Sequence, residues 1–422
     1  MEKIKLYTVN GYSILLISIP SKATYVQGYI QTGFINENKT NIGLSHLVEH
    51  ISVSSWKKCK TSCPKFWKNK GVIQNAYTGN TFVGYWIEGL SKYTENMIEY
   101  IISQSTCDWP LKKRIFKGEK KAVKEEILRN FNTQQWKLWD QLMKSVYYNC
   151  GTQFCQDWPL QLENLKKFNE SDVINFCNKL YIPSKTLFTV AGSFDNKKII
   201  QLFGTKLKKK FACPTPKKFN INNEKIVKFI ENKKHKKTDI IIAFHSTFYP
   251  CDKETQLFGI IEILLSGGLE SILLNHLREK LHLIYSLSLS FDTDITGTIT
   301  TIEVNTSDEN VKKVIEQIFL KLKEFNEKKY DRQLLNGAKN KFLIQKAETC
   351  KTVQWLSDWY GSQYANQLDK KEKKIYTFEK IINIIEKTTK KELATISKKL
   401  FNLKKFKIIY MGKSKLHKRL KT

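Results

Sequence analysis

Apolar and polar positions along the chain predict strands and helices in an order that occurs twice. Near the amino terminus, an Asn-Gly pair at residues 10–11 separates two extended stretches, and the second stretch carries the apolar run 14–19. Asn-Gly favours the tight turn of a β-hairpin. No small-residue cleavage site follows the run, so the pattern predicts two paired strands rather than an export signal.

Two segments share one pattern, in which an amphipathic helix is followed by a short break and an apolar strand that ends at glycine. These segments are SDVINFCNKLYIPSKTLFTVAGSF, residues 171–194, and KKELATISKKLFNLKKFKIIYMGK, residues 390–413. Leu180 and Gly192 correspond to Leu400 and Gly412, each 220 positions later. A constant offset indicates an internal duplication.

The beginnings of the two halves correspond as well. Residues 25–51 predict a strand, a polar loop and a helix, and residues 239–265 repeat that order at an offset near 213. We therefore predict an α+β fold of two homologous domains, each a largely antiparallel sheet packed with helices.

A lysine-rich stretch with two prolines, residues 206–225, separates the halves and reads as a linker. It divides the chain into an N-terminal domain, residues 1–205, and a C-terminal domain, residues 226–422.

The net charge of +31 raises the possibility of a nucleic-acid partner, but only five of the 71 basic residues are arginines. Arginine is the residue that best reads bases and phosphates, and the sequence contains no nucleic-acid-binding motif. We therefore expect a lysine-coated surface and no nucleic-acid partner; a basic cavity that attracts acidic peptides is an alternative. No apolar stretch reaches the roughly 18 residues that cross a bilayer, so we expect no membrane span.

Nine cysteines, an odd number, are scattered along the chain. The close pairs Cys59/Cys63 and Cys150/Cys155 lack the Cys-x-x-Cys spacing of many metal and redox sites. This usage is typical of reduced thiols, and we expect a cytoplasmic protein.

Candidate chemistry is concentrated in the sequence HLVEH, residues 46–50. On a helix, His46 and His50 are one turn apart and point the same way, so both imidazoles can reach one cation. Glu49 lies beside them and can take a proton from a water molecule. We expect this helix to begin near Ile42, with Asn38, Thr40 or Asn41 as its cap.

A catalytic zinc ion requires a third protein ligand. The predicted helix GEKKAVKEEILRN, residues 118–130, offers Glu119 and Glu126 two turns apart on one face. Because the apolar residues Ala122 and Val123 lie between them, we expect this face to be packed. The second half of the chain has no histidine between His245 and His276, so we expect one metal site per chain. The alternative is that His46 and His50 are partly buried polar residues of an amphipathic helix.

The motif HLVEH, together with the distant Glu126, resembles the inverted zinc-binding motif HxxEH of the pitrilysin (insulinase) family of zinc metallopeptidases. The resemblance implies that His46, His50 and Glu126 are zinc ligands. It implies further that Glu49 is the base that activates water and that Glu119 supports the site.

Two further segments resemble parts of that family. QNAYTGNTFVGYW, residues 74–86, resembles the edge strand on which a substrate backbone pairs, which implies substrate contacts at Asn75, Ala76 and Tyr77. SGGLESILLNHLREKLHLIYSLSLSF, residues 266–291, resembles the segment whose arginine and tyrosine, here Arg278 and Tyr285, approach the zinc site of the facing half and hold the substrate carbonyl or the oxyanion. Simple packing and ion pairing of these two residues is the alternative.

Full-length family members carry four such repeats, and this chain resembles the half-size branch, whose members pair. The resemblance implies a homodimer, or a heterodimer with a homologous half-size subunit. We predict a zinc-dependent endopeptidase that acts on peptides or short unfolded segments and that matures peptide or bacteriocin precursors. The alternatives are a non-catalytic or assembly subunit of a peptidase dimer and, on charge alone, a nucleic-acid binder.

Overall fold

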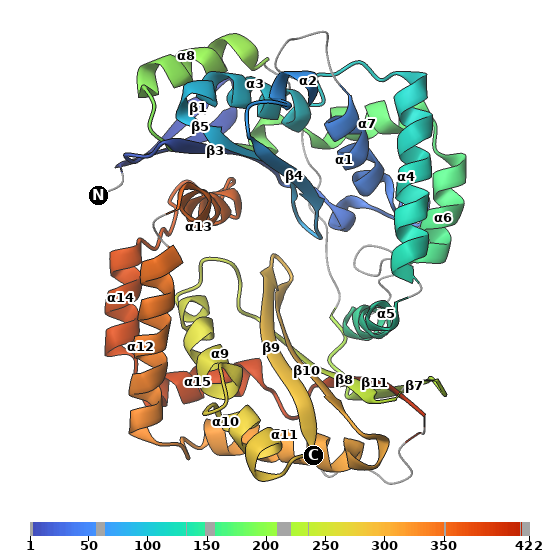
Figure 1. Ribbon diagram of the computed structural model, residues 1–422, viewed down its shortest axis with the longest axis vertical. Coiled ribbons are helices and arrows are strands. Elements are labelled where there is room, and N and C mark those ends of the chain that lie inside the picture. Colours follow the sequence, from blue (N-terminus) through green and yellow to red (C-terminus); the bar gives the residue numbers. More distant parts are fainter. Residues whose placement is uncertain are drawn as a thin grey trace. The chain divides into compact units, whose positions relative to one another are not determined.

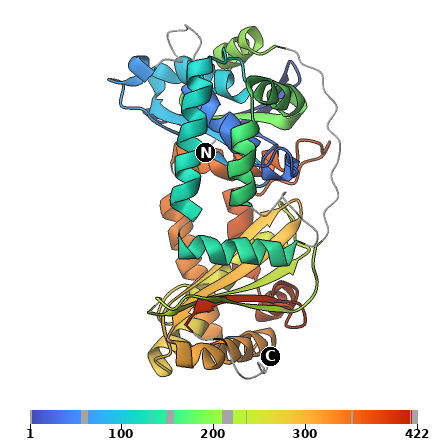
Figure 2. The ribbon, with the colours of Figure 1, turned by 90° about the vertical axis from the view of Figure 1, so that its right-hand side faces the viewer.

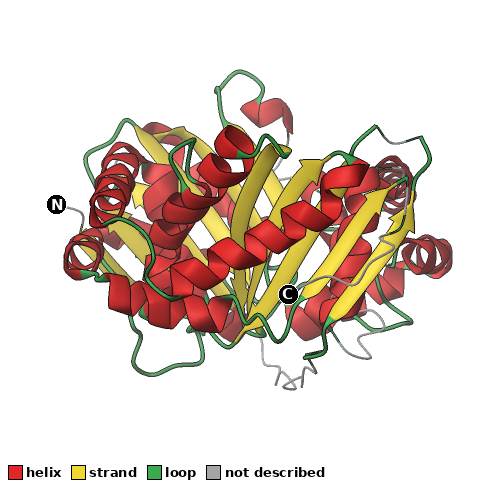
Figure 3. Ribbon diagram, turned by 90° about the horizontal axis from the view of Figure 1, so that it is seen from below, coloured by secondary structure: helices red, strands yellow, loops and turns green. Residues whose placement is uncertain are grey.

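The computed structural model describes residues 3–55, 64–131, 133–147, 157–208, 221–234, 236–349, 352–413 and 415. These residues form two units, each built around one β-sheet with helices packed across it (Figures 1 and 3). The predicted α+β class with two largely antiparallel sheets is confirmed.

The sheet of the first unit has the strand order β1-β2-β6-β3-β5-β4. Its strands are β1 (Lys3–Val9), β2 (Tyr12–Ser18), β3 (Ala23–Ile30), β4 (Ile73–Thr78), β5 (Val83–Leu90) and β6 (Thr186–Gly192). Among these described strands, β2 and β6 alone pair in parallel. The hairpin predicted from Asn-Gly is present, because Asn10 and Gly11 both have positive φ, 51° and 88°, as a type I′ turn requires.

Helices cover both faces of this sheet (Figure 1). They are α1 (Leu44–Ser54), α2 (Pro64–Trp67), α3 (Thr94–Ser105), α4 (Lys113–Phe131), α6 (Trp158–Lys167), α7 (Glu170–Leu180), α8 (Asn196–Lys206) and α13 (Val353–Ala365). Helix α3 packs so closely on one face that a Cβ on Gly28 would lie 2.0 Å from the Ser105 hydroxyl. Helix α13 packs on the other face, where Leu356 and Tyr360 join a core cluster with Tyr25 and Tyr29.

The sheet of the second unit has the order β7-β11-β8-β10-β9, with only β7 and β11 parallel. Its strands are β7 (Ile226–Glu231), β8 (Thr238–Ser246), β9 (Ile284–Asp294), β10 (Gly297–Thr306) and β11 (Lys407–Gly412). Its helices are α5 (Gln134–Val146), α9 (Phe258–Ser266), α10 (Ile272–Leu274), α11 (Val311–Asn326), α12 (Arg332–Thr349), α14 (Phe378–Lys387) and α15 (Lys390–Leu400). The order repeats β2-β6-β3-β5-β4 of the first sheet strand for strand, which supports the predicted duplication.

The bounds of corresponding elements keep the predicted offset. Helix α15 (Lys390–Leu400) begins and ends 220 positions after α7 (Glu170–Leu180). Strands β6 and β11 end at Gly192 and Gly412, which are the same distance apart. At Gly192 φ is 150°, and a Cβ would lie 2.6 Å from the Thr24 hydroxyl, so both backbone conformation and close approach explain this glycine.

Each unit also takes a helix from the other half of the sequence. Helix α5 lies across β11 and β8 of the second unit (Figure 2), and α13 lies across β6 and β3 of the first. Most of the predicted linker, residues 209–220, and the pairs Cys59/Cys63 and Cys150/Cys155 lie outside the described residues. The domain boundaries at 205 and 226 therefore stay a prediction. Among the described helices, none is both long and apolar enough to cross a lipid bilayer.

Candidate metal centre

Helix α1, which carries the HLVEH motif, begins at Leu44 after a residue in the left-handed conformation. Gly43 has φ of 93°, and a Cβ there would approach the Gln161 side chain to 3.3 Å. The fully buried carboxylate of Glu37 accepts hydrogen bonds from the backbone N–H groups of Gly43 (2.9 Å) and Ser45 (2.7 Å). A negative charge at this end also complements the helix dipole.

The predicted cap was therefore wrong. Asn38 accepts from the backbone N–H of Thr40, and Asn41 accepts from that of Asn38, so these side chains stabilise the turn before the helix. Short polar side chains hydrogen-bond readily to backbone groups near them, and here Asn38 and Asn41 do so within the turn and not at the helix end. The longer Glu37 side chain reaches the helix end from the beginning of that turn.

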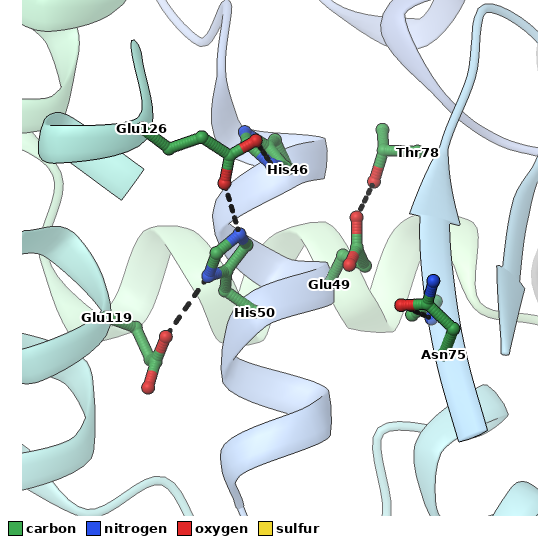
Figure 4. A network of polar contacts seen from close by, with 8 residues as sticks. His46, Glu49, His50, Asn75, Thr78, Glu119 and Glu126 are labelled. Carbon is green, nitrogen blue, oxygen red and sulfur yellow. Dashed lines mark hydrogen bonds and ion pairs between the residues drawn. The ribbon is translucent and has the colours of Figure 1, made fainter. Parts of the chain in front are cut away.

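The two histidines lie on one side of α1 and turn toward α4 (Figure 4). The centroids of the His46 and His50 rings are 4.7 Å apart, and the rings are nearly perpendicular, at 86°. This is the one-turn neighbour relation that the spacing of four predicts.

Helix α4 brings two glutamates to the same place. Phe116, Val123 and Ile127 are buried on α4, and Glu119 and Glu126 continue their stripe at helical spacing. The face is thus packed as predicted at Val123, although Ala122 is exposed. Because this stripe packs against α1, both carboxylates are directed at the histidines.

One ligand atom from each of His46, His50 and Glu126 lies within 4.8 Å of the other two. The Nε2 atom of His46 is 3.8 Å from Glu126 Oε1, and Nε2 of His50 is 3.3 Å from Glu126 Oε2. Zinc with ligands at about 2.0–2.1 Å in a tetrahedron holds neighbouring ligand atoms roughly 3.4 Å apart. Within the described part of the chain, this is the one group of three or more His, Cys, Asp or Glu side chains that could hold a metal.

Glu119 contacts the opposite nitrogen of His50. The distance from His50 Nδ1 to Glu119 Oε2 is 3.2 Å. An ionised carboxylate can only accept, so Nδ1 carries the proton, and in the neutral ring the lone pair is on Nε2, the atom that faces Glu126. Glu119 therefore lies where a supporting carboxylate would orient a metal ligand.

The surroundings act differently on the two imidazoles. Burial, together with the neighbouring His50, lowers the pKa of His46 to about 4, so His46 is neutral at physiological pH. Burial also lowers the pKa of His50, but the Glu119 hydrogen bond and the surrounding carboxylates outweigh it, and the net pKa is raised. The same hydrogen bond lowers the pKa of Glu119.

Glu49 points from α1 toward strand β4 and away from the His50–Glu119 contact (Figure 4). Its side chain is buried, and its Oε2 accepts a hydrogen bond of 2.8 Å from the Thr78 hydroxyl. Burial raises the pKa of Glu49, against the opposing effects of Thr78 and His50. A carboxylate with raised proton affinity beside the candidate ligands is suited to proton transfer.

The predicted substrate strand is β4, which among the described strands is an outer one and pairs with β5 alone. Asn75 and Tyr77 are exposed, and Ala76 lies between them. The backbone N–H of Ala76 donates to Asn75 Oδ1 at 2.9 Å, and Tyr77 Oη accepts from Gln27 at 3.3 Å. All three residues therefore lie on a strand with one open edge.

Arg278 and Tyr285 belong to the second unit. Arg278 lies in a π-helical turn, Asn275–Lys280, with Nε 3.7 Å from Glu279. Tyr285 on β9 is 56% exposed, and the Lys237 ammonium lies 3.7 Å from the centroid of its ring. Their predicted role at the metal centre stays a prediction.

Thr78 and Glu37 contact the site, and neither was predicted from the sequence as a site residue. Nothing in the sequence connects Thr78 with Glu49, which belongs to a different and earlier element, until β4 is placed beside α1. Glu37 had a weak signal, because it is an acidic residue in the turn that precedes the motif.

Two family models match this chain. One described as Insulinase (Peptidase family M16) matches residues 13–153, and one described as Peptidase M16 inactive domain matches residues 167–342. An uncharacterized zinc protease of Rickettsia felis is 24% identical over 372 residues, which cover 84% of this chain and 86% of that protein. The mitochondrial-processing peptidase subunit beta of Bos taurus is 24% identical over 178 residues, which cover 41% of this chain and 35% of that protein.

The fold is shared with a solved structure. The crystal structure of a protease from Helicobacter pylori matches with a TM-score of 0.84 at 16% identity, over 97% of this chain and 100% of that chain. The two matched family models together span most of the chain and include both histidines and Glu126. This chain belongs to the insulinase (pitrilysin) family, peptidase family M16.

Proposed function

We propose that the protein is a zinc endopeptidase that hydrolyses peptide bonds within peptides or short unfolded segments. The observation that carries the proposal is the convergence of His46, His50 and Glu126 from two helices, with one ligand atom of each residue within 4.8 Å of the others. The zinc proteases among its relatives support it.

A zinc ion held by His46, His50 and Glu126 would supply a Lewis acid that polarises the scissile carbonyl and lowers the pKa of a water molecule, so that a base can deprotonate it. Glu49 takes the proton of that water at its carboxylate, and burial favours the protonated form of the acid. Glu49 then gives the proton to the amine that leaves as the C–N bond breaks. Glu119 holds the His50 ring in the orientation and tautomer that ligation requires.

The open edge of β4 offers a place for an extended peptide to pair as an added strand. The Ala76 N–H, now bonded to the Asn75 side chain, is a donor that such a peptide would engage. Backbone pairing selects extended chains and depends little on side chains, which is why peptides and unfolded segments are the proposed substrates.

We extend the proposal to the partner and the pathway. A homodimer or a heterodimer with a homologous subunit would bring Arg278 and Tyr285 of one copy to the metal centre of another; a relative named as a subunit, the peptidase beta subunit of Bos taurus, supports pairing. Maturation of peptide or bacteriocin precursors in the cytoplasm is the proposed setting.

The test compares the zinc-loaded protein with Glu49→Gln on a library of quenched fluorescent peptides. Glu49→Gln is expected to keep about one zinc per chain and to lose cleavage by about 100-fold or more. Undiminished cleavage by Glu49→Gln would contradict the assignment of Glu49 as the base. Zinc binding without any cleavage by the native chain would favour the alternative, a non-catalytic subunit of a peptidase dimer.

A further inference from the structure

The hydroxyl of Thr78 makes a direct contact with the proposed catalytic base. Thr78 Oγ1 donates to Glu49 Oε2 at 2.8 Å, a normal distance for a hydrogen bond to a carboxylate (Figure 4). The bond occupies one oxygen of a buried side chain and leaves Oε1 as the second acceptor.

Thr78 also belongs to the strand that would hold the substrate. Side chains alternate along β4, so Ala76 and Thr78 face α1, while Asn75 and Tyr77 face the opposite side. The Tyr77 ring confirms this alternation, because it lies over Gly84 on the far face, where a Cβ would come within 2.3 Å of it. One short strand thus presents an open edge to a peptide and a hydroxyl to Glu49.

We infer that Thr78 is a positioning residue, which fixes the Glu49 carboxylate so that Oε1 receives the proton of the attacking water. The inference rests on the proposed function. Because the hydrogen bond originates on β4, any shift of that strand when a peptide pairs with its edge moves the carboxylate as well. Thr78 therefore connects substrate docking with the geometry of proton transfer.

A purely structural role for Thr78 makes different predictions. If the hydroxyl only satisfied a buried carboxylate, its loss would lower stability or zinc content and leave turnover per folded, zinc-loaded molecule unchanged. If it positions the base, kcat per folded, zinc-loaded molecule falls while KM and zinc content are maintained, since β4 keeps its edge and the ligands keep their places.

The experiment compares Thr78→Val, which keeps the β-branched shape and removes the hydroxyl, with Thr78→Ser, which keeps the hydroxyl. Thr8→Val is the matched control, because Thr8 is an exposed threonine on β1, the opposite outer strand of the same sheet. We expect kcat of Thr78→Val to fall about 10- to 100-fold, the range for one hydrogen bond to a charged group. Thr78→Ser and Thr8→Val should stay within about threefold of the native chain on the same scale.

Crystal structures of the native chain and of Thr78→Val give a readout that does not depend on activity. The Glu49 carboxylate is expected to leave its present position in Thr78→Val. An unmoved carboxylate, an unchanged kcat, or a Thr78→Ser variant as impaired as Thr78→Val would overturn the inference. If the native zinc-loaded chain cleaves no peptide, the proposed function fails, and the crystallographic comparison alone decides whether Thr78 positions Glu49.

Discussion

Glu119 gives the sharpest quantitative prediction, because its only predicted task is to hold His50. Its Oε2 is 3.2 Å from His50 Nδ1, and the Glu119 side chain is 20% exposed, so water replaces the contact poorly. Removing a carboxylate that orients a metal-ligating histidine weakens metal binding by about 10- to 100-fold. We expect that loss for Glu119→Ala. We expect a smaller loss for Glu119→Gln, whose amide oxygen still accepts a hydrogen bond from Nδ1–H but lacks the charge.

The assay is competition for zinc between the protein and a chromophoric chelator at fixed pH and ionic strength. Glu125→Ala is the matched control, because Glu125 is the exposed neighbour of Glu126 on α4. Zinc affinity is expected to be highest for the native chain and Glu125→Ala, lower for Glu119→Gln and lowest for Glu119→Ala. Equal affinity for Glu119→Ala and the native chain would show that His50 does not need this partner, and would refute the assignment of Glu119.

Two further predictions concern protonation and the start of α1. Zinc affinity should fall as the pH falls, with His50 as the group that takes up the proton, because the pKa of His50 is raised and that of His46 is lowered to about 4. Calorimetry at pH 6 in buffers of different ionisation enthalpy is expected to count about one proton released per zinc ion; a count near two would contradict the neutral state of His46. Glu37→Ala leaves two buried N–H groups at the start of α1 without their acceptor, at a cost of roughly 2–4 kcal/mol. A urea midpoint equal to that of the native chain would show that Gly43 and Ser45 find other acceptors.

Local periodicity was enough to predict the helix that carries His46 and His50, because a spacing of four fixes their relative direction whatever surrounds them. The duplicated helix–strand units were predictable for the same reason. Their pattern is local, and α7 and α15 keep the predicted constant offset at both ends.

Contacts that depend on tertiary structure were not predictable. The hydrogen bond from Thr78 to Glu49 exists only because β4 lies beside α1, and no periodicity in either segment encodes that neighbour. Helices α5 and α13 show the same limit. An amphipathic pattern says that one face is apolar, but not that this face covers the sheet built from the other half of the sequence.

The cap of α1 shows how local chemistry can mislead. Asn38, Thr40 and Asn41 are good capping residues by type, yet their short side chains bond within the preceding turn. The longer Glu37 side chain reaches the helix end instead, and burial makes its two charge-assisted hydrogen bonds effective.

The most direct test is anomalous X-ray diffraction from crystals of the zinc-loaded protein, recorded on both sides of the zinc absorption edge. The account predicts one strong peak per chain, within bonding distance of Nε2 of His46, Nε2 of His50 and the Glu126 carboxylate. A peak elsewhere, or zinc-saturated crystals with no peak between those three side chains, would contradict it.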